Sequence, residues 1–366
     1  MSLTDYGWTE ALGREFAAQA VAGWEPARVV CELRRNFYAV QLESGEYLGE
    51  CGGGFFHVAR RAEQFPAIGD WGAVERRDEG SRVHIRAVLP RRTKFSRRAA
   101  GTEEVEQIVA ANVDTVFLVS GLDHNYNPRR IQRFVVAARE SGAEPVILLN
   151  KSDLVEDGNA LMAEVAAAVP GVPVYLTSAQ TRKGLKALQA NYALPGRTLA
   201  FVGSSGAGKS SLVNALLKEE ALPVGDVRER DSKGRHTTTR RELVLTPSGA
   251  LLIDTPGLRE LQLWDADVAV EETFPDIAQW ALRCRFSNCR HDTEKGCAVL
   301  AAITAGELTT ERLEAYRKLR NEADARASRK KKPSALASKP GWRTRDDHAQ
   351  PFRHRHHREE EPQRRR

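Results

Sequence analysis

The chain has 366 residues, 41% of them hydrophobic, which is enough for two to three packed domains. Charged residues near the start, such as Asp5 and Glu10, interrupt any stretch that a secretory signal would need, and no apolar run approaches the length of a membrane span. We therefore expect a cytoplasmic protein with no membrane contact.

The formal charge of +6 is unevenly distributed. Residues 326–366 include 14 Lys/Arg and 5 Asp/Glu, and residues 81–98 include seven Lys/Arg and no acid. Two basic segments on an otherwise near-neutral chain favour a polyanionic partner, because cations that neutralise phosphates release condensed counterions. For the C-terminal segment, solvated charge without a partner is an equally good interpretation.

The first part of the chain has the pattern of a small β-barrel. After an N-terminal extension, residues 1–27, short alternating runs such as RVVCEL and NFYAVQL are separated by turn residues over 28–100. Cys31 and Cys51 lie in this segment and are interpreted as small buried hydrophobic residues.

The pattern then changes twice. Over 101–266, apolar strands alternate with helical patterns, which indicates a mostly parallel sheet flanked by helices. Residues 267–326 are mainly helical with a cysteine-rich interruption. Residues 327–366, rich in Lys, Arg, Pro and His, have too few apolar side chains to bury and are expected to be disordered when free.

The stretch GSSGAGKSS, residues 203–211, lies between an apolar strand and an apolar helix, as phosphate-binding loops do. Glycines allow its backbone N–H groups to turn toward phosphate oxygens. Lys209 is expected to bridge the β- and γ-phosphates, and Ser210 to bind Mg²⁺. The predicted nucleotide contacts of this loop are Gly203, Ser204, Ser205, Gly206, Ala207, Gly208, Lys209, Ser210 and Ser211.

The sequence NKSD, residues 150–153, follows the apolar strand PVILL and is typical of a guanine-binding element. The Asp153 carboxylate accepts from the ring N–H and the amine of guanine, which adenine does not present together. Lys151 lays its methylene stem along the base, and Asn150 ties its loop to the phosphate loop. In TSAQ, residues 177–180, Ser178 and the Ala179 N–H are expected to face the guanine carbonyl.

Two further segments have the properties of nucleotide switches. DTPG, residues 254–257, supplies Asp254 to the Mg²⁺ shell and the Gly257 N–H to the γ-phosphate. In GRHTTTR, residues 234–240, Thr239 is the preferred Mg²⁺ ligand and Thr238 the second choice.

Leu258 stands where many GTPases have a glutamine that orients the attacking water, and an apolar side chain cannot do this. Intrinsic hydrolysis is therefore predicted to be slow. Either His236 or a group from the partner is expected to orient the water, and an ordinary exposed role for His236 stays an alternative.

These elements occur in permuted order, with the base-reading element first. Sheet neighbours bring the loops together, so the pocket does not depend on chain order. The outside connections do change, because DTPG now leads directly into the C-terminal third and Gly257 is only 27 positions from Cys284. Hydrolysis could therefore act on the C-terminal module through a short tether.

The spacing Cys284-x4-Cys289-x-His291-x5-Cys297 predicts a metal centre. Three thiolates and one imidazole form a closed tetrahedral Zn²⁺ site, which fixes structure and leaves no open position for catalysis. The metal would hold together a small helical module whose own core is thin. Disulfides are disfavoured in a cytosolic chain.

The order NKxD, TSA, GxxxxGKS, HTTT, DTPG, between a β-barrel and the cysteine cluster, resembles the ribosome small-subunit-dependent GTPase A (RsgA) family over about residues 28–320. The resemblance implies a multidomain fold: an OB-fold barrel, a circularly permuted P-loop GTPase and a mainly helical zinc-binding domain. It implies GTP/GDP, Mg²⁺ and one structural Zn²⁺ as ligands. It also implies subunit-stimulated GTP hydrolysis in late maturation of the small ribosomal subunit, with that subunit and its rRNA as partners. The family's nucleotide and zinc residues fall on those named above, Leu258 matches a family trait, and the tail after Ala327 departs from the family.

We expect a monomer, and other functions stay open. A GTPase acting on a protein or tRNA would be stimulated by that partner and not by small subunits. A GTP-gated RNA-binding module would bind subunits alike with GTP and GDP. A phosphotransferase would leave NKSD unexplained.

Overall fold

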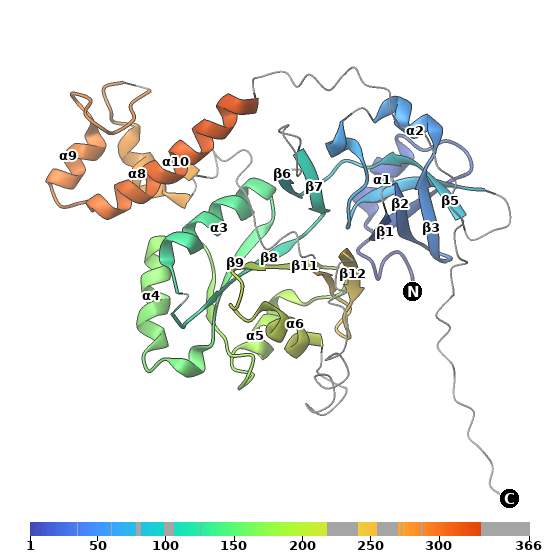
Figure 1. Ribbon diagram of the computed structural model, residues 1–366, viewed down its shortest axis with the longest axis horizontal. Coiled ribbons are helices and arrows are strands. Elements are labelled where there is room, and N and C mark those ends of the chain that lie inside the picture. Colours follow the sequence, from blue (N-terminus) through green and yellow to red (C-terminus); the bar gives the residue numbers. More distant parts are fainter. Residues whose placement is uncertain are drawn as a thin grey trace, which may run out of the picture. The chain divides into compact units, whose positions relative to one another are not determined.

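The computed structural model describes residues 1–34, 36–59, 61–77, 82–98, 106–124, 126–217, 241–254, 270–271, 273–286 and 288–330 (Figure 1). The chain divides into two units, residues 1–332 and 333–366, and all described residues lie in the first. The predicted disordered segment therefore lies, except for residues 327–330, outside the described part of the chain.

Five strands near the N-terminus close into a barrel, as the alternating pattern predicts. Their order is β1-β2-β3-β5-β4, and β4 also pairs with β1. Only β3 and β5 are parallel to each other. The bounds are β1 (Trp24–Arg34), β2 (Phe37–Leu42), β3 (Gly45–Cys51), β4 (Trp71–Arg76) and β5 (Arg82–Val88), with the short helix α2 (Gly53–Val58) after β3. This closed five-stranded architecture is that of an OB-type barrel.

Alternate residues of the barrel strands fill its interior, since successive side chains of a strand point to opposite faces. Val40, Val83 and Ile85 are buried there together with Cys51. Cys31 is also buried, in the larger cluster that the barrel shares with the central sheet. The prediction that both cysteines are small buried hydrophobic residues is confirmed.

The basic segment 81–98 does not form one structure. Its first part belongs to β5, whereas β6 (Lys94–Arg98) leaves the barrel and pairs antiparallel with β7 (Glu106–Ala111). Several of its cations also have carboxylate partners, because Arg86 pairs with Glu75, Arg91 with Asp70, and Lys94 with Glu106. The free positive charge of this segment is therefore smaller than the sequence suggests.

The central domain is a mostly parallel sheet in the order β10-β9-β8-β11-β13-β12, in which only β12 is antiparallel to its neighbour β13. Its strands are β8 (Thr115–Gly121), β9 (Glu144–Asn150), β10 (Val174–Leu176), β11 (Thr198–Gly203), β12 (Arg241–Leu245) and β13 (Leu251–Asp254). Its helices are α3 (Pro128–Ser141), α4 (Gly158–Ala168), α5 (Leu185–Tyr192) and α6 (Lys209–Leu217). This is the alternation that the apolar runs predict.

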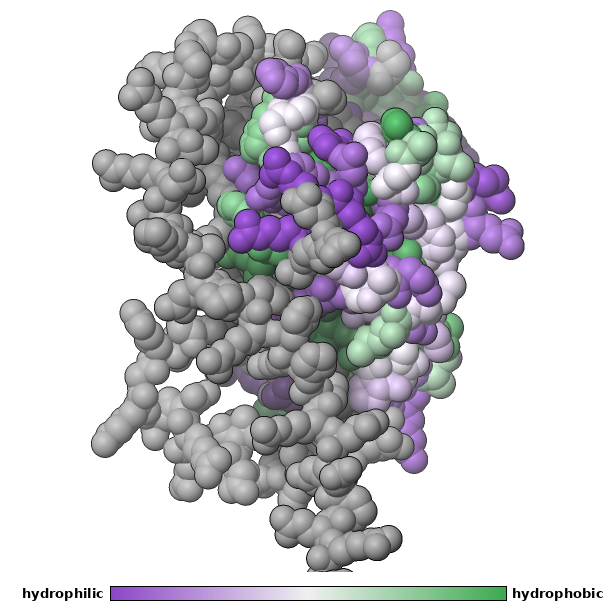
Figure 2. All heavy atoms as spheres, turned by 90° about the vertical axis from the view of Figure 1, so that its right-hand side faces the viewer, coloured by the Kyte–Doolittle hydropathy of each residue, from purple (hydrophilic) through white to green (hydrophobic). Residues whose placement is uncertain are grey.

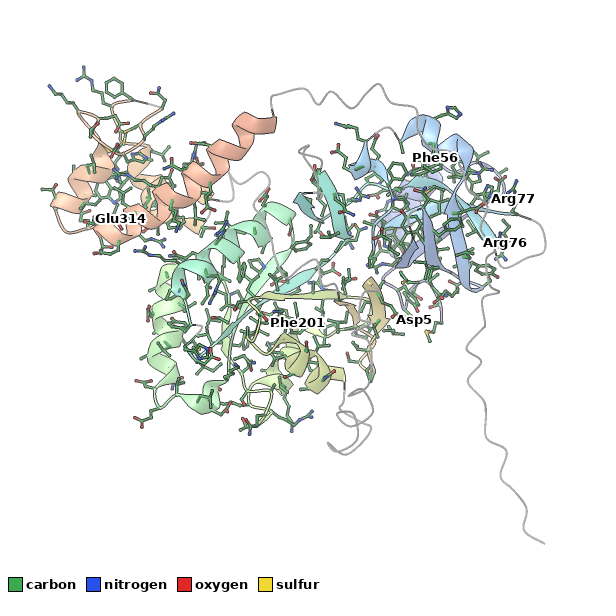
Figure 3. All side chains as sticks on the ribbon, viewed as in Figure 1. Asp5, Phe56, Arg76, Arg77, Phe201 and Glu314 are labelled. Carbon is green, nitrogen blue, oxygen red and sulfur yellow. The ribbon has the colours of Figure 1, made fainter. Side chains whose placement is uncertain are left out.

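Alternation along β8 divides the core into two layers. Val116 and Leu118 lie in the cluster that includes α3 and α4, and Phe117 and Val119 lie in the cluster that includes α5 and α6. Phe201, labelled in Figure 3, belongs to the second layer. Both faces of β8 are buried, which explains why its central residues, Val116 to Val119, are all apolar.

The barrel and the central sheet share one hydrogen-bonded ladder, because β12 pairs with β1 through Cys31↔Glu242. Arg28, a residue of β1, is buried. Its guanidinium donates to the carbonyl of Tyr6 and, at 2.8 Å, to Oγ1 of Thr198, and it stacks 5.1 Å from the Trp71 ring. The N-terminal extension therefore packs into the core, together with the helix α1 (Glu10–Ala17). Sequence reasoning did not predict this shared ladder.

The C-terminal part contains α8 (Pro275–Ala281), α9 (Ala298–Thr304) and α10 (Thr310–Lys330), so the last helix runs past the expected boundary at 326. Within this module, Arg312 of α10 pairs with Asp276 of α8 at 2.8 Å. The same guanidinium joins the module to the central domain by donating to the carbonyl of Ala168 at the end of α4. An ion pair connects the same two parts: Oε2 of Glu314, labelled in Figure 3, lies 3.8 Å from Nη2 of Arg129 in α3.

Across the described ranges, none of the helices combines the length and the apolar character that crossing a membrane requires.

Candidate nucleotide site and metal centre

The phosphate loop joins the end of β11 to the start of α6, as the sequence predicts. Two of its glycines are required by close approach. An ideal Cβ on Gly208, whose φ is +92°, would lie 2.2 Å from Nδ2 of Asn150, and one on Gly203 would lie 2.2 Å from the carbonyl oxygen of Val119. Any side chain at either position would push the loop away from β8 and β9.

Lys209 closes this loop on itself. Its Nζ donates at 2.7 Å to the carbonyl oxygens of both Gly203 and Ser204. The ammonium is thus held inside the curve of the loop, where the glycine turns and the start of α6 favour an anion. Ser205, Ser210 and Ser211 are exposed.

The side chain of Asn150 connects the predicted base-reading and phosphate-binding segments. It is buried, and its Nδ2 donates to the carbonyl of Ala207 at 2.9 Å. Its Oδ1 accepts from the Ala179 N–H at 3.3 Å and from Thr177 Oγ1 at 3.5 Å. One amide therefore holds the loops after β9, β10 and β11 together, and the contact predicted between Asn150 and the phosphate loop is present.

The other base-reading residues lie in the same loops. Asp153 is exposed in the 3-10 turn η2 (Ser152–Leu154), and Lys151 before it has a left-handed backbone, φ 63°. Ser178 is fully buried, and its Oγ accepts from the Thr181 N–H at 3.1 Å. Ser178 and the Ala179 N–H thus brace the loop internally, and their contact with guanine stays a prediction.

An ion pair that sequence reasoning missed lies beside these residues. The Nζ of Lys151 is 2.6 Å from Oδ2 of Asp123, in the loop after β8. An acid directly after a strand that neighbours the NKSD strand is the only signal that the sequence contained.

The switch residues are only partly within the described chain. Thr238, Thr239, His236, Gly257 and Leu258 lie outside it. Asp254 is the last residue of β13, and β13 runs parallel to β11 with Ala200 opposite Ile253. The carboxyl end of β13 is therefore at the same sheet edge as the phosphate loop.

The four predicted metal ligands converge. The ligand atoms of Cys284, Cys289, His291 and Cys297 all lie within 4.8 Å of one another. The sulfurs of Cys284 and Cys297 are 3.9 Å apart, and each is 3.5 Å from Nδ1 of His291. A tetrahedral zinc with ordinary bond lengths separates two sulfurs by about 3.8 Å, and a sulfur from a nitrogen by about 3.5 Å. The donor set and its spacing fit Zn²⁺.

Protonation and local turns agree with this interpretation. Burial lowers the pKa of His291, which keeps the imidazole neutral with a lone pair to donate. Burial, with the thiols of Cys297 and Cys284, raises the pKa of Cys289 to about 12, so a bound cation is needed for this thiol to ionise near neutral pH. Glu294 braces the loop by accepting from the N–H groups of Arg290 and Asp292, each at 2.8 Å.

Comparison with known proteins shows the family to which the chain belongs. A family model described as RsgA GTPase matches residues 88–264, and one described as 50S ribosome-binding GTPase matches residues 198–336. The small ribosomal subunit biogenesis GTPase RsgA of Opitutus terrae is 45% identical over 352 residues, which cover 94% of this chain and 95% of that protein. The chain belongs to the RsgA family.

Two solved structures have the same architecture. YjeQ from Thermotoga maritima is 27% identical with a TM-score of 0.61, covering 83% of this chain and 99% of that one. YloQ, described as a circularly permuted GTPase, is 25% identical with a TM-score of 0.59, covering 86% and 99%. The predicted permuted GTPase fold is confirmed. The protein is a GTP-hydrolysing enzyme that uses a guanine nucleotide and Mg²⁺.

Proposed function

We propose that this protein binds the small ribosomal subunit and hydrolyses GTP in the late maturation of that subunit, with turnover stimulated by the subunit. The observation that carries the proposal is the buried amide of Asn150, which joins the base-reading loops to the phosphate loop in a chain of the RsgA family. The protein is proposed to act as a cytoplasmic monomer.

Each part of the nucleotide has a proposed partner. The exposed carboxylate of Asp153 accepts from the ring N–H and amine of guanine, and the stem of Lys151 covers the base. The ammonium of Lys209 exchanges its two carbonyl acceptors for β- and γ-phosphate oxygens. When bound, Mg²⁺ neutralises charge on the phosphates, and Ser210, Asp254 and Thr239, or in its place Thr238, would hold it.

Hydrolysis needs a water in line with the γ-phosphate, and Leu258 has no polar group with which to orient it. Slow turnover in isolation follows. Either His236 or a group of the bound subunit is proposed to orient the water, which makes the subunit the activator.

The metal centre is proposed to hold one structural Zn²⁺ on Cys284, Cys289, His291 and Cys297. Its closed set of four protein ligands leaves no position for a substrate. The surface around it favours RNA contact, because Arg283 stacks 4.7 Å from the Trp280 ring and Arg285 lies 5.5 Å from the Phe286 ring. Exposed arginines beside aromatic rings are suited to stacking on unpaired bases.

The barrel offers a second surface for rRNA. Arg76 and Arg77 lie at its outer side in Figure 3. Arg76 pairs with Glu25 and stacks 4.7 Å from the Tyr47 ring, and the side chain of Arg77 is 66% exposed. Figure 2 views the molecule from the right-hand side of Figure 1, where the barrel lies. Hydrophilic residues gather in the middle of this view. A stacked arginine and a hydrophilic face fit a phosphate backbone with exposed bases.

The test is the GTPase rate with purified small subunits, with large subunits and without either, at low and at high salt. Stimulation by small subunits alone, weakening as salt rises, is expected. Stimulation by tRNA or another protein in place of the subunit would favour the non-ribosomal alternative. Equal subunit affinity with GTP and GDP, without stimulated turnover, would favour a GTP-gated RNA-binding module.

A further inference from the structure

The geometry points to Asp123 as a positioning residue of the guanine site, which acts by holding Lys151 against the place where the base binds. The inference rests on the proposed placement of guanine at residues 150–153. Asp123 is not part of the NKSD motif, because the helix α3 and the strand β9 lie between it and Lys151.

The two side chains come from neighbouring strand ends. Asp123 follows β8 and Lys151 follows β9, and these parallel strands are in register with Gly121 opposite Asn150. The Leu122 N–H also donates to the carbonyl of Asn150 at 2.8 Å. The two loops therefore leave the sheet together, and the position of Asp123 relative to Lys151 is fixed by backbone pairing.

The ion pair is short and partly shielded from water. Nζ of Lys151 lies 2.6 Å from Oδ2 of Asp123, and the side chain of Asp123 is only 12% exposed while that of Lys151 is 30% exposed. A charge-assisted hydrogen bond in such surroundings is stronger than an exposed pair. The ammonium end of Lys151 is thus restrained.

The other end of Lys151 is restrained by its backbone. Its φ of 63° is unusual for a residue other than glycine and sets the direction in which the side chain leaves the chain. With both ends fixed, the methylene stem has little freedom before the nucleotide arrives. When the base packs on this stem, little side-chain entropy is lost, because the stem is already ordered, and this favours binding.

Gly121 provides the space for this arrangement. An ideal Cβ at position 121 would lie 3.0 Å from Oδ1 of Asp123 and 3.5 Å from Cδ of Lys151. The carboxylate and the lysine stem therefore pass against the backbone of β8 at one point. A methyl group there would displace the pair while leaving both charges in the chain.

The test is a double-mutant cycle on GDP affinity, measured with a fluorescent GDP analogue, using Asp123→Asn and Lys151→Met. Asp123→Asn is expected to weaken GDP binding about three- to tenfold in the otherwise native protein, and less than about twofold in the Lys151→Met background. Gly121→Ala should weaken binding in the same direction. The matched control is Glu156→Gln, an exposed acid in the loop after β9, which should leave GDP affinity unchanged.

An equal loss from Asp123→Asn in both backgrounds, or no loss in either, would overturn the inference. A separate variant tests the placement of the base. Asp153→Asn should shift preference from guanine toward xanthine nucleotides, because the asparagine amide can donate to the second carbonyl of xanthine. If Asp153→Asn shows no such shift, the proposed guanine site is wrong, whatever the cycle at Asp123 gives.

Discussion

Around Asn150, strands buried on both faces hold the loops, with Leu118, Ile147 and Leu148 almost fully shielded from water. Around Cys284, by contrast, α8 and α9 have seven residues each, and the turns between them are fixed by four converging ligand atoms. The first site is supported by apolar burial, and the second has the four ligands of the proposed zinc in addition to buried residues such as Ile277 and Val299. Substitutions at the first should therefore impair binding and spare the fold, whereas substitutions at the second should do the reverse.

Removal of the metal has the largest expected effect. Structural zinc in small domains contributes about 10 kcal/mol or more to folding, so a chelator, or Cys289→Ser, should unfold the module that contains α8 and α9. Limited proteolysis of residues 270–330 measures this. The control is GDP affinity, measured after the chelator is removed and Mg²⁺ is restored, or with Cys289→Ser in the absence of chelator, and it should persist. A chelated protein that stays protease-resistant in this region would mean that apolar packing alone holds the module.

Lys209→Ala tests the nucleotide site, where substitutions are expected to impair binding and spare the fold. GTP affinity should fall about 100-fold, because the ammonium makes charge-assisted bonds to the phosphates. The free energy of unfolding should change by less than about 1 kcal/mol, since the two carbonyl acceptors can turn to water. Nucleotide titration and urea denaturation give the two values, and Lys186→Ala on the exposed face of α5 is the matched control.

Asn150→Ala should lower both the stability of the fold and the affinity for GDP, unlike the other substitutions in the nucleotide site. Its amide is buried and joins Ala207 to Ala179, so removal leaves buried backbone groups without partners and should cost about 2 kcal/mol of stability. GDP affinity should fall about tenfold, because the loops lose their common support. If denaturation curves of the variant and the native protein coincide, the amide is not the structural link that its bonds suggest.

Arg312→Met should give the smallest effect. Arg312 is mostly buried and pairs with Asp276, which is 37% exposed, so the loss should be about 1 kcal/mol. Cleavage between the central domain and α9 should become faster while zinc content stays at one per chain. Lower zinc content would show instead that this contact supports the metal centre itself.

The sequence predicted best the residues whose geometry is local or repeated. Lys209 and the glycines around it follow a strand and open a helix, so their place at the sheet edge follows from the spacing alone. The three cysteines and His291 lie within fourteen residues, which is short enough for the chain to bring them together.

Contacts between distant parts of the chain were not predictable in this way. Cys31 and Glu242 pair across more than two hundred positions, and nothing in RVVCEL distinguishes an edge that stays inside the barrel from one that also joins another sheet. Arg28 had the appearance of an ordinary strand cation, yet it is buried against Thr198 and Trp71. Asp123 gained its significance only from the register of β8 with β9.

The strand β12 has neighbours on both sides, β13 toward the phosphate loop and β1 in the barrel. Turning the barrel as a rigid body against the GTPase would therefore require breaking main-chain bonds as well as side-chain contacts. A hinge motion between the barrel and the GTPase domain is therefore disfavoured. Small changes in the twist of β12 can instead be transmitted to β1 through the strand pairing. In that case, loss of the γ-phosphate would reach an RNA bound to the barrel as a change in the twist of the barrel strands.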